Sequence, residues 1–268
     1  YSYKEIGKII GISEECISTK FSGLKKGKRI TYNYLSDFKR ITPELAYVLG
    51  FITGDGWISR PEVNYYQLMI TNKIDDAIYL EKTFNKVTQW NVTKRKEDNN
   101  LRKDQIRFTI SNKELVNFLN EDLDLKNKNN YFSQKLIDFI PEHLHQYLLR
   151  GLFDADGGVY RPQDKYFACD IASNIGFDWQ SLSNFIESKT GVTSNIYKCH
   201  IKKSDSYSSI LKLYGHNAAK FLSYIYKDFP KDNIGFTRKF INYVRYIERR
   251  AISPYYFRMI KNQDLIGV

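Results

Sequence analysis

Two aspartates in the chain have surroundings that suit metal-dependent hydrolysis. Asp55 stands near the end of residues 45–56 and Asp156 near the end of residues 146–157, and in both segments an apolar stretch leads into an Asp-Gly pair. One such pair is an ordinary turn at the end of a helix. Two pairs in matching positions favour a shared site, in which carboxylate oxygens hold a divalent cation that activates water.

Small residues indicate how two helices bring these aspartates together. In the first segment Ala46, Gly50 and Gly54 fall at i, i+4 and i+8, on one face of a helix. Gly151 and Ala155 lie on the matching face of the second segment. Because small residues on one face let two helix backbones approach closely, we predict that the two segments are helices that pack against each other.

The aspartates are predicted to stand at the ends of these helices. Gly56 and Gly157 follow them directly, and we expect both glycines in the left-handed conformation that ends a helix. A carboxylate there faces the negative end of the helix dipole, and two converging carboxylates repel each other. A cation would offset both effects. Mg²⁺ is the simplest candidate, and Mn²⁺ and Ca²⁺ are alternatives.

The similarity between the two segments continues downstream, so the chain contains an internal repeat of about a hundred residues. Residues 67–73 align with 168–174, and residues 132–139 align with 236–243 in chemical type at every place. The order of apolar periodicities in each repeat is helix, two strands, helix, two strands, helix. We therefore predict an α+β fold of two pseudo-symmetric αββαββα repeats, each with an antiparallel sheet.

The individual elements follow from the same periodicities. The predicted strands are residues 66–71, 91–96, 105–110, 166–172, 194–202 and 208–214. The predicted helices between them are residues 75–86, 112–120, 179–190 and 217–226. The predicted parts of the chain are an N-terminal extension at 1–40, a first repeat at 41–140, a second repeat at 141–250 and a C-terminal tail at 251–268.

The N-terminal extension has the spacing of a helix-turn-helix. Residues 4–10 and 14–24 are predicted as helices joined by a turn at 11–13 with Ser13 as N-cap, and the basic run 25–29 follows. A small helical, DNA-binding extension is one interpretation. A helical hairpin packed on the main body is the other.

Composition narrows the class of partner and compartment. The 41 Lys and Arg outnumber the 30 Asp and Glu, and the net charge of +11 favours a polyanionic partner. No apolar run reaches the roughly 18 residues of a membrane span, so we expect no membrane association. Three widely spaced cysteines predict a reducing compartment: a microbial cytoplasm, in association with the nucleoid, or an organellar matrix, and not secretion. The histidines and cysteines lack zinc-site spacing.

The two motif segments resemble the LAGLIDADG homing endonuclease family in its single-chain, two-motif form. Residues 149–157 match the family motif almost throughout, whereas residues 48–56 depart from it at Thr53 and Gly54 but keep the acid at Asp55. The resemblance covers residues 43–250 and implies that the motif helices form the interface between repeats and that the two sheets form a saddle over DNA.

The resemblance also implies an activity. Asp55 and Asp156, with Gly54 and Ala155 as neighbouring metal ligands, would bind divalent metal above the minor groove and each cut one strand of the duplex. The expected partner is a pseudo-palindromic double-stranded DNA site of about twenty base pairs, bound by a monomer.

Members of this family also place a basic residue in each active site, where it stabilises charge in the transition state. The alignment of the repeats nominates Lys135 and Lys239 for this role. The alternatives are that both are surface lysines or that Lys239 binds a backbone phosphate. Gln134 and Arg238, their neighbours in the sequence, could share the role.

Polar and basic side chains that alternate along the predicted strands are candidates for DNA contacts, because strands in a major groove can present them to base edges and phosphates. The candidates are Arg60, Tyr66, Gln67, Lys94, Lys96, Arg102, Gln105, Arg107, Arg161, Gln163, Lys165, Asn195, Lys198 and Lys202.

Two other functions fit the same scaffold. One is an RNA maturase that binds intron RNA and assists splicing, and the other is a non-cleaving DNA-binding regulator that acts through the helix-turn-helix. Because both Asp55 and Asp156 are intact, the sequence favours the nuclease. A bifunctional protein is compatible with the same residues.

Overall fold

The computed structural model describes Ser13 and residues 34–59, 65–87, 90–96, 104–160, 167–201 and 206–251. Both repeats belong to one compact unit, Tyr34–Val268. The predicted N-terminal helices and the basic run lie outside the described residues, and so does the predicted C-terminal tail apart from its first residue, Ala251.

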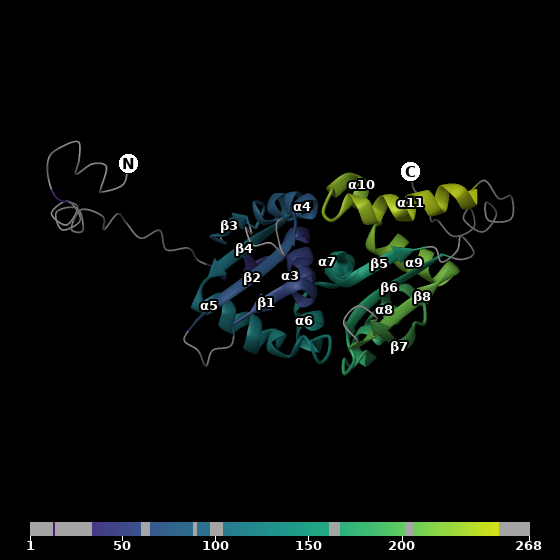
Figure 1. The fold of residues 1–268 in the computed structure, drawn as a ribbon, viewed down its shortest axis with the longest axis horizontal. Coiled ribbons are helices and arrows are strands. Elements are labelled where there is room, and N and C mark those ends of the chain that lie inside the picture. The colour runs from purple at the N-terminus through teal and green to yellow at the C-terminus, as the bar shows by residue number, and fades with distance from the viewer. Residues whose placement is uncertain are drawn as a thin grey trace. The chain divides into compact units, whose positions relative to one another are not determined.

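Each repeat contains a four-stranded antiparallel sheet (Figure 1). The first sheet is formed by β1 (Gly56–Ile58), β2 (Gln67–Lys73), β3 (Thr93–Lys96) and β4 (Gln105–Ser111), in the order β1-β2-β4-β3. The second is formed by β5 (Gly157–Tyr160), β6 (Ala168–Asn174), β7 (Asn195–Ile201) and β8 (Ser206–Tyr214), in the order β5-β6-β8-β7. The equivalent order confirms the predicted α+β fold of two similar repeats.

The helices also follow the predicted plan. The first repeat contains α3 (Pro43–Asp55), α4 (Ile74–Phe84), α5 (Lys113–Asn117) and α6 (Gln134–Phe139). The second contains α7 (His145–Asp156), α8 (Gln180–Thr190), α9 (Gly215–Ile225), α10 (Phe229–Asp232) and α11 (Thr237–Ala251). One prediction differs: in place of a single helix at 112–120, the short helix α5 is followed by a π-helical turn at Phe118–Asp122.

The two motif helices, α3 and α7, lie side by side between the sheets (Figure 1). A Cβ added to Gly50 would lie 2.0 Å from the backbone oxygen of Leu148, and one added to Gly151 would lie 2.0 Å from the backbone oxygen of Tyr47. The contact is reciprocal, so the helix backbones touch where the small residues stand. This confirms the predicted helix interface.

Gly56 and Gly157 correct one expectation. Their φ angles are −73° and −88°, so neither glycine is left-handed. The reason for glycine is steric: an added Cβ would lie 2.6 Å from the oxygen of Ile52 in one case and 2.3 Å from Cδ2 of Phe153 in the other. Glycine thus lets the chain leave each helix directly into a strand, β1 or β5, without a connecting loop.

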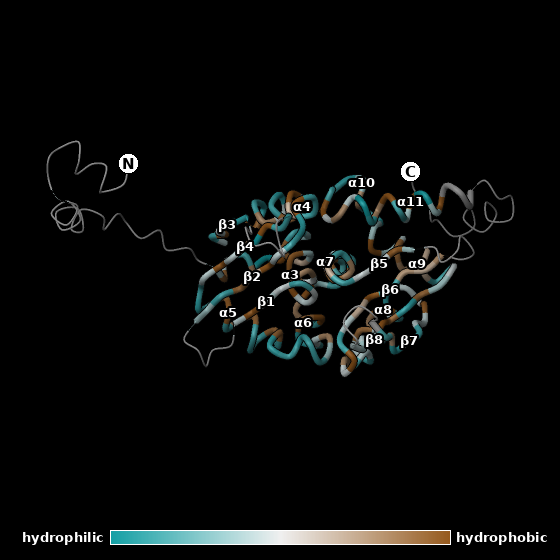
Figure 2. Tube along the Cα trace, viewed as in Figure 1, coloured by the Kyte–Doolittle hydropathy of each residue, from teal (hydrophilic) through white to brown (hydrophobic). Residues whose placement is uncertain are grey.

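Each sheet has one face covered by helices and one open face. In β2 and β4 the buried side chains are Leu68, Ile70, Phe108 and Ile110, which alternate with more exposed residues. In β6 and β8 the buried side chains are Cys169, Ile171, Ser209, Leu211 and Leu213, and Ala168 at the start of β6 is buried as well. Hydrophobic and hydrophilic positions accordingly alternate along the strands (Figure 2). Within the described part of the chain, every helix is too short or too polar to cross a membrane.

The last segment of each repeat packs on the other repeat. Phe132 stacks on Phe185 of α8, with ring centroids 6.1 Å apart. Its counterpart Phe236 meets Phe51 of α3 edge to face, at 5.5 Å. Both phenylalanines are buried. The aligned segments 132–139 and 236–243 therefore play the same part in the structure, since each contributes a phenylalanine to the core of the other half.

Candidate functional site

The two aspartates meet at the C-terminal ends of the packed helices. Asp55 is the last residue of α3, and Asp156 is the last residue of α7. A Cβ added to Gly54 would lie 2.8 Å from Oδ2 of Asp156 and 2.5 Å from Cβ of Ala155. The helix ends therefore touch, and only a residue without a side chain at position 54 lets the two acids lie this close.

Proximity and partial burial alter both carboxyl groups. Loss of solvent raises the pKa of Asp156 to about 6, and the charge of Asp55 adds to the rise. Desolvation also raises the pKa of Asp55, while the ammonium groups of Lys239 and Lys128 oppose that rise. Crowded acids of this kind are stabilised in their ionised form by a positive charge placed between them.

Two lysines stand next to the acids. Nζ of Lys239 lies 2.7, 2.7 and 2.6 Å from the backbone oxygens of Phe153, Asp154 and Gly157, at the end of α7. In the first repeat Lys128 binds the end of α3 in the same manner. Its Nζ lies 3.1 and 2.9 Å from the backbone oxygens of Thr53 and Gly54.

These ammonium groups satisfy carbonyls that a helix end leaves unpaired, and they oppose the negative end of its dipole. Burial lowers the pKa of Lys239 to about 8, and burial also lowers the pKa of Lys128. In both cases the negative charge of Asp55 acts in the opposite direction, because the lysines lie near the acid pair.

In space the counterpart of Lys239 is Lys128, and not Lys135, which the sequence alignment paired with it. Lys135 is exposed, and its Nζ donates to the backbone oxygen of Glu121 at 3.1 Å. The alignment holds for the buried phenylalanines, but the chain before them is built differently in the two repeats. A 3₁₀ turn at Leu125–Asn127 precedes Lys128 in the first repeat, whereas α10 occupies that region in the second.

The neighbours nominated with these lysines are engaged elsewhere. Gln134 donates to Asp138, one helical turn along α6, at 2.8 Å. Arg238 forms a two-pronged ion pair with the buried Asp76 of α4, with nitrogen–oxygen distances of 2.8 to 3.2 Å. That pair ties α11 of the second repeat to the first repeat, so its role in the structure is to join the two halves.

Asn72 is a site residue that sequence reasoning missed. Its Nδ2 lies 3.3 Å from Oδ2 of Asp55 and orients that carboxylate. The matching position in the second repeat holds Ser173, because Ile70 pairs with Gly56 and Ile171 pairs with Gly157 in the same register. The alignment of the strands could have identified this position, because the residues that follow Thr71 and Ala172, Asn72 and Ser173, are both polar.

The donor set fits a divalent cation of the Mg²⁺ kind. The Asp156 carboxylate borders a hollow of about 50 Å³ that is also lined by Lys128, Ser173 and Gly54, the residue before Asp55. Mg²⁺ binds through one or two carboxylates and keeps several waters, so it needs no larger set of protein ligands. The described residues contain no cluster of three or more His, Cys, Asp or Glu. The backbone oxygen of Gly54, a predicted ligand, accepts from Lys128.

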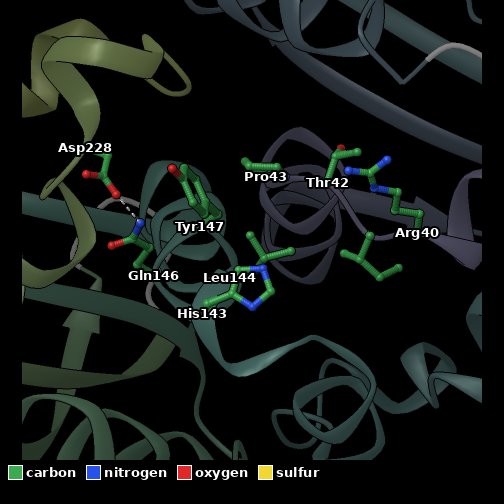
Figure 3. A pocket seen from close by; sticks show the side chains of 9 residues that line it. Arg40, Thr42, Pro43, His143, Leu144, Gln146, Tyr147 and Asp228 are labelled. Carbon is green, nitrogen blue, oxygen red and sulfur yellow. Dashed lines mark hydrogen bonds between the residues drawn. The ribbon is translucent and has the colours of Figure 1, made fainter.

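A larger hollow of about 540 Å³ lies at the other ends of the motif helices (Figure 3). Arg40, Thr42 and Pro43 line one side of it, and His143 and Tyr147 lie among the residues on the other. Its charged lining residues are Arg40, before α3, and Asp228 of the second repeat. The acid pair lies at the opposite ends of the same helices.

The predicted DNA contacts divide according to the two faces of each sheet. The register places Gln67, Gln105, Arg107 and Asn195 on the open faces, together with Arg95, which was not predicted. Lys94, Lys96 and Lys198 alternate onto the opposite side, and Lys94 binds Glu81 of α4 at 2.7 Å. Tyr66 lies just before β2, with Nζ of Lys113 5.3 Å from its ring centroid. Six of the predicted contacts lie outside the described residues: Arg60, Arg102, Arg161, Gln163, Lys165 and Lys202.

Fold and site together define a class: a protein of two similar α+β repeats whose packed helices end in a pair of acids. Residues 144–226 match the family model described as a LAGLIDADG-like domain. This match lies in the second repeat, and the resemblance predicted from the sequence is confirmed. A comparison with curated proteins gave no match.

Several solved structures are similar to this chain at low sequence identity. The homing endonuclease I-WcaI bound to its DNA recognition sequence is 17% identical with a TM-score of 0.47, and the match covers 81% of this chain and 95% of that chain. I-DmoI in complex with DNA and Ca is 19% identical with a TM-score of 0.44, covering 68% and 88%. The N-terminal LAGLIDADG domain of DUF199/WhiA is 14% identical with a TM-score of 0.43, covering 73% and 88%.

Proposed function

We propose that the protein is a site-specific DNA endonuclease that depends on a divalent metal and cuts both strands of a long duplex site as a monomer. The observation that carries the proposal is the meeting of Asp55 and Asp156 at the ends of two packed helices, between two sheets with open faces. One acid per repeat matches one cut per strand.

The residues of the chain have distinct parts in this reaction. Asp55 and Asp156 would hold Mg²⁺, which when bound supplies an activated water and stabilises the charge of the leaving oxygen. Asn72 holds the Asp55 carboxylate in one orientation through its hydrogen bond. Lys128 and Lys239, fixed by backbone oxygens, supply positive charge beside the phosphate that undergoes cleavage.

The charge of the molecule supports a DNA substrate. The net charge is +11, and basic side chains lie on the open face of each sheet, among them Arg95, Arg107 and Lys212. Phosphate neutralisation by such groups gives most of the affinity for duplex DNA and makes it fall with rising salt. Hydrogen bonds to base edges then provide the selection of one site.

The test is a cleavage assay on a randomised or genomic duplex library with Mg²⁺, followed by sequencing of the ends. We expect metal-dependent double-strand cuts at one long site. Asp55→Asn and Asp156→Asn should each reduce the products to nicks or abolish them. Asp122→Asn, a charge-matched change at an exposed position in the π-helical turn, should cut like the parent protein.

Two other results would overturn the proposal. Tight duplex binding without any cut in Mg²⁺ or Mn²⁺ would point to a DNA-binding regulator. Weak duplex binding with tight binding of intron RNA, and splicing that survives the combined Asp55→Asn and Asp156→Asn changes, would point to a maturase.

A further inference from the structure

The two sheets differ in the side chains that their open faces present near the aspartates. On each open face, side chains that are paired across neighbouring strands form rows. We call the row at the level of the aspartate the inner row, and the row two residues further along the strands the outer row. In the first repeat the inner row is Thr71, Arg107 and Arg95. In the second repeat the equivalent inner row is Ala172, Ile210 and Tyr197.

The outer rows show the reverse chemistry. In the first repeat the outer row is Trp57, Met69, Thr109 and Thr93. In the second repeat it is Gly158, Asp170, Lys212 and Asn195. From the aspartate outward, the first sheet is therefore basic and then apolar, whereas the second is apolar and then charged.

The groove geometry allows both rows to reach bases. Two neighbouring strands of a sheet fit the major groove, which is about 12 Å wide, and not the minor groove, which is about 6 Å wide. Rows two residues apart along a strand are separated by about 6.7 Å. Since base pairs are stacked at about 3.4 Å, the outer row meets the duplex about two base pairs beyond the inner row.

Several features of these rows are costly in the free protein. Arg95 and Arg107 stand directly opposite each other, and like charges in that position destabilise a sheet. Trp57 and Tyr197 leave 48% and 41% of their surface in solvent. Contact with DNA would offset these costs, because phosphate and guanine attract the arginines and base methyl groups cover the aromatic rings.

Lys212 is held ready for a specific contact. Its Nζ lies 4.6 Å from the ring centroid of Tyr160 and 5.2 Å from that of Tyr214. The two rings hold the ammonium group on the open face, opposite Asp170 of the neighbouring strand, where its hydrogens can be donated to acceptors such as O6 and N7 of guanine. In the first repeat these three positions hold Thr109, Ser59 and Ser111.

From these rows we propose that the two halves of the DNA target carry guanine and thymine preferences in opposite order from the centre. The half bound by the first repeat has guanine at the inner position, read by Arg107, and thymine at the outer position, where Met69 and Trp57 contact its methyl group. The half bound by the second repeat has thymine at the inner position, beside Ile210, and guanine at the outer position, read by Lys212. This inference rests on the proposed function and specifies its substrate.

The test is selection of a randomised duplex library by binding of the full chain without Mg²⁺, followed by cleavage of the selected pool with Mg²⁺. Binding reports base preference whether or not the chain cuts, so the inference and the nuclease proposal fail separately. The expected profile has the two preferences in opposite order in its two halves. A symmetric profile, or no base preference at these positions, would overturn the inference even if the DNA is cut.

Matched exchanges between the repeats sharpen the test. Arg107→Ile should reduce discrimination for guanine at the inner position of one half by about ten- to a hundredfold and leave the other half unchanged. Ile210→Arg should create a guanine preference at the inner position of the opposite half and make the target more symmetric. Lys94→Ile removes a positive charge on the helix-covered side and should leave the profile unaltered.

The exchanges also have outcomes that contradict the inference. If Arg107→Ile lowers affinity equally for every sequence, the arginine binds phosphate only and the assignment is wrong. Thermal unfolding of each variant identifies loss of fold, and Arg107→Lys keeps the charge as a second variant, with a partial loss of discrimination expected. Failure of the parent chain to bind any duplex would overturn both this inference and the proposed function.

Discussion

The two repeats position equivalent aspartates by different means. In the second repeat, the buried Asp154 accepts hydrogen bonds from the hydroxyl of Tyr47 at 2.9 Å and from the backbone nitrogen of Phe236 at 2.7 Å. The fully buried Arg150, one turn earlier, binds Asp232 and two backbone oxygens. A network of ionic and polar contacts thus fixes α7 to its surroundings.

In the first repeat the same two positions hold Thr53 and Leu49. The hydroxyl of Thr53 donates to the oxygen of Gly50 within its own helix, at 2.6 Å, and Leu49 is buried among apolar side chains. The departure of this segment from the family motif therefore does not move its aspartate. The difference shows that apolar packing and a buried polar network are interchangeable supports for one geometry of the acid pair.

The largest effect is expected from a variant that breaks the buried polar network of the second repeat. Asp154→Ala leaves the hydroxyls of Tyr47 and Tyr226 and the backbone nitrogen of Phe236 without their buried acceptor, so we expect a loss of about 3 to 5 kcal/mol in the free energy of unfolding. The matched change Thr53→Ala removes one hydrogen bond and should cost about 1 kcal/mol. Urea unfolding of both variants measures the difference, and equal losses would contradict this comparison of the repeats.

A second prediction compares the lysines at the two helix ends. Lys128→Met and Lys239→Met should each slow cleavage by about a hundredfold or more, because each removes a charge that stabilises the transition state. Lys135→Met, at the exposed position, is the matched control and should cut normally. Strand-resolved gels of end-labelled duplex measure the rates. A loss with Lys135→Met equal to that with Lys128→Met would restore the pairing that sequence alignment suggested.

The smallest expected effect is a pH dependence that differs between the two acids. The pKa of Asp156 is raised from 3.8 to about 6 in the folded protein, so the folded state binds its proton more tightly than the unfolded chain does. The stabilisation is complete below the unfolded pKa and is lost as the pH rises from about 4 through 6. Metal-free protein should therefore melt at a lower temperature at pH 7 than at pH 4.5.

The matched variants separate the acids in this experiment. The measurement is the melting temperature as a function of pH, without divalent metal. Asp156→Asn should remove most of the fall in melting temperature between pH 4.5 and 7. Asp55→Asn should also reduce it, because the Asp55 charge contributes to the raised pKa of Asp156. An unchanged slope in Asp156→Asn would show that other groups produce the dependence.

Much of the fold could be predicted from the sequence, because the relevant signals are local. Alternation along residues 105–110 and 208–214 predicted β4 and β8 to within a few residues. The small residues Gly50 and Gly151 predicted the helix contact because close backbone approach excludes larger side chains. The acid pair was predictable for the same reason, since each aspartate lies a fixed distance along a helix from its glycine.

The remaining features depend on contacts between distant segments. Alternation shows that Lys94 and Arg95 point to opposite faces of a strand, but only the pairing of β3 with β4 shows which side faces the helices. Lys128 reaches the end of α3 from an irregular segment whose path has no periodic signal. Helix-ending glycines are usually left-handed, whereas Gly56 is required by a collision with Ile52 that only the fold produces.

The exchange of phenylalanines between repeats has a consequence for the engineering of chimeric proteins. Phe132 belongs to the first half of the chain but completes the core of the second, and Phe236 does the reverse. A half grafted from a relative therefore brings its own aromatic anchor but must find a suitable pocket in the recipient. Exchange should succeed when Phe51 and Phe185 are transferred or matched together with the segments that pack on them.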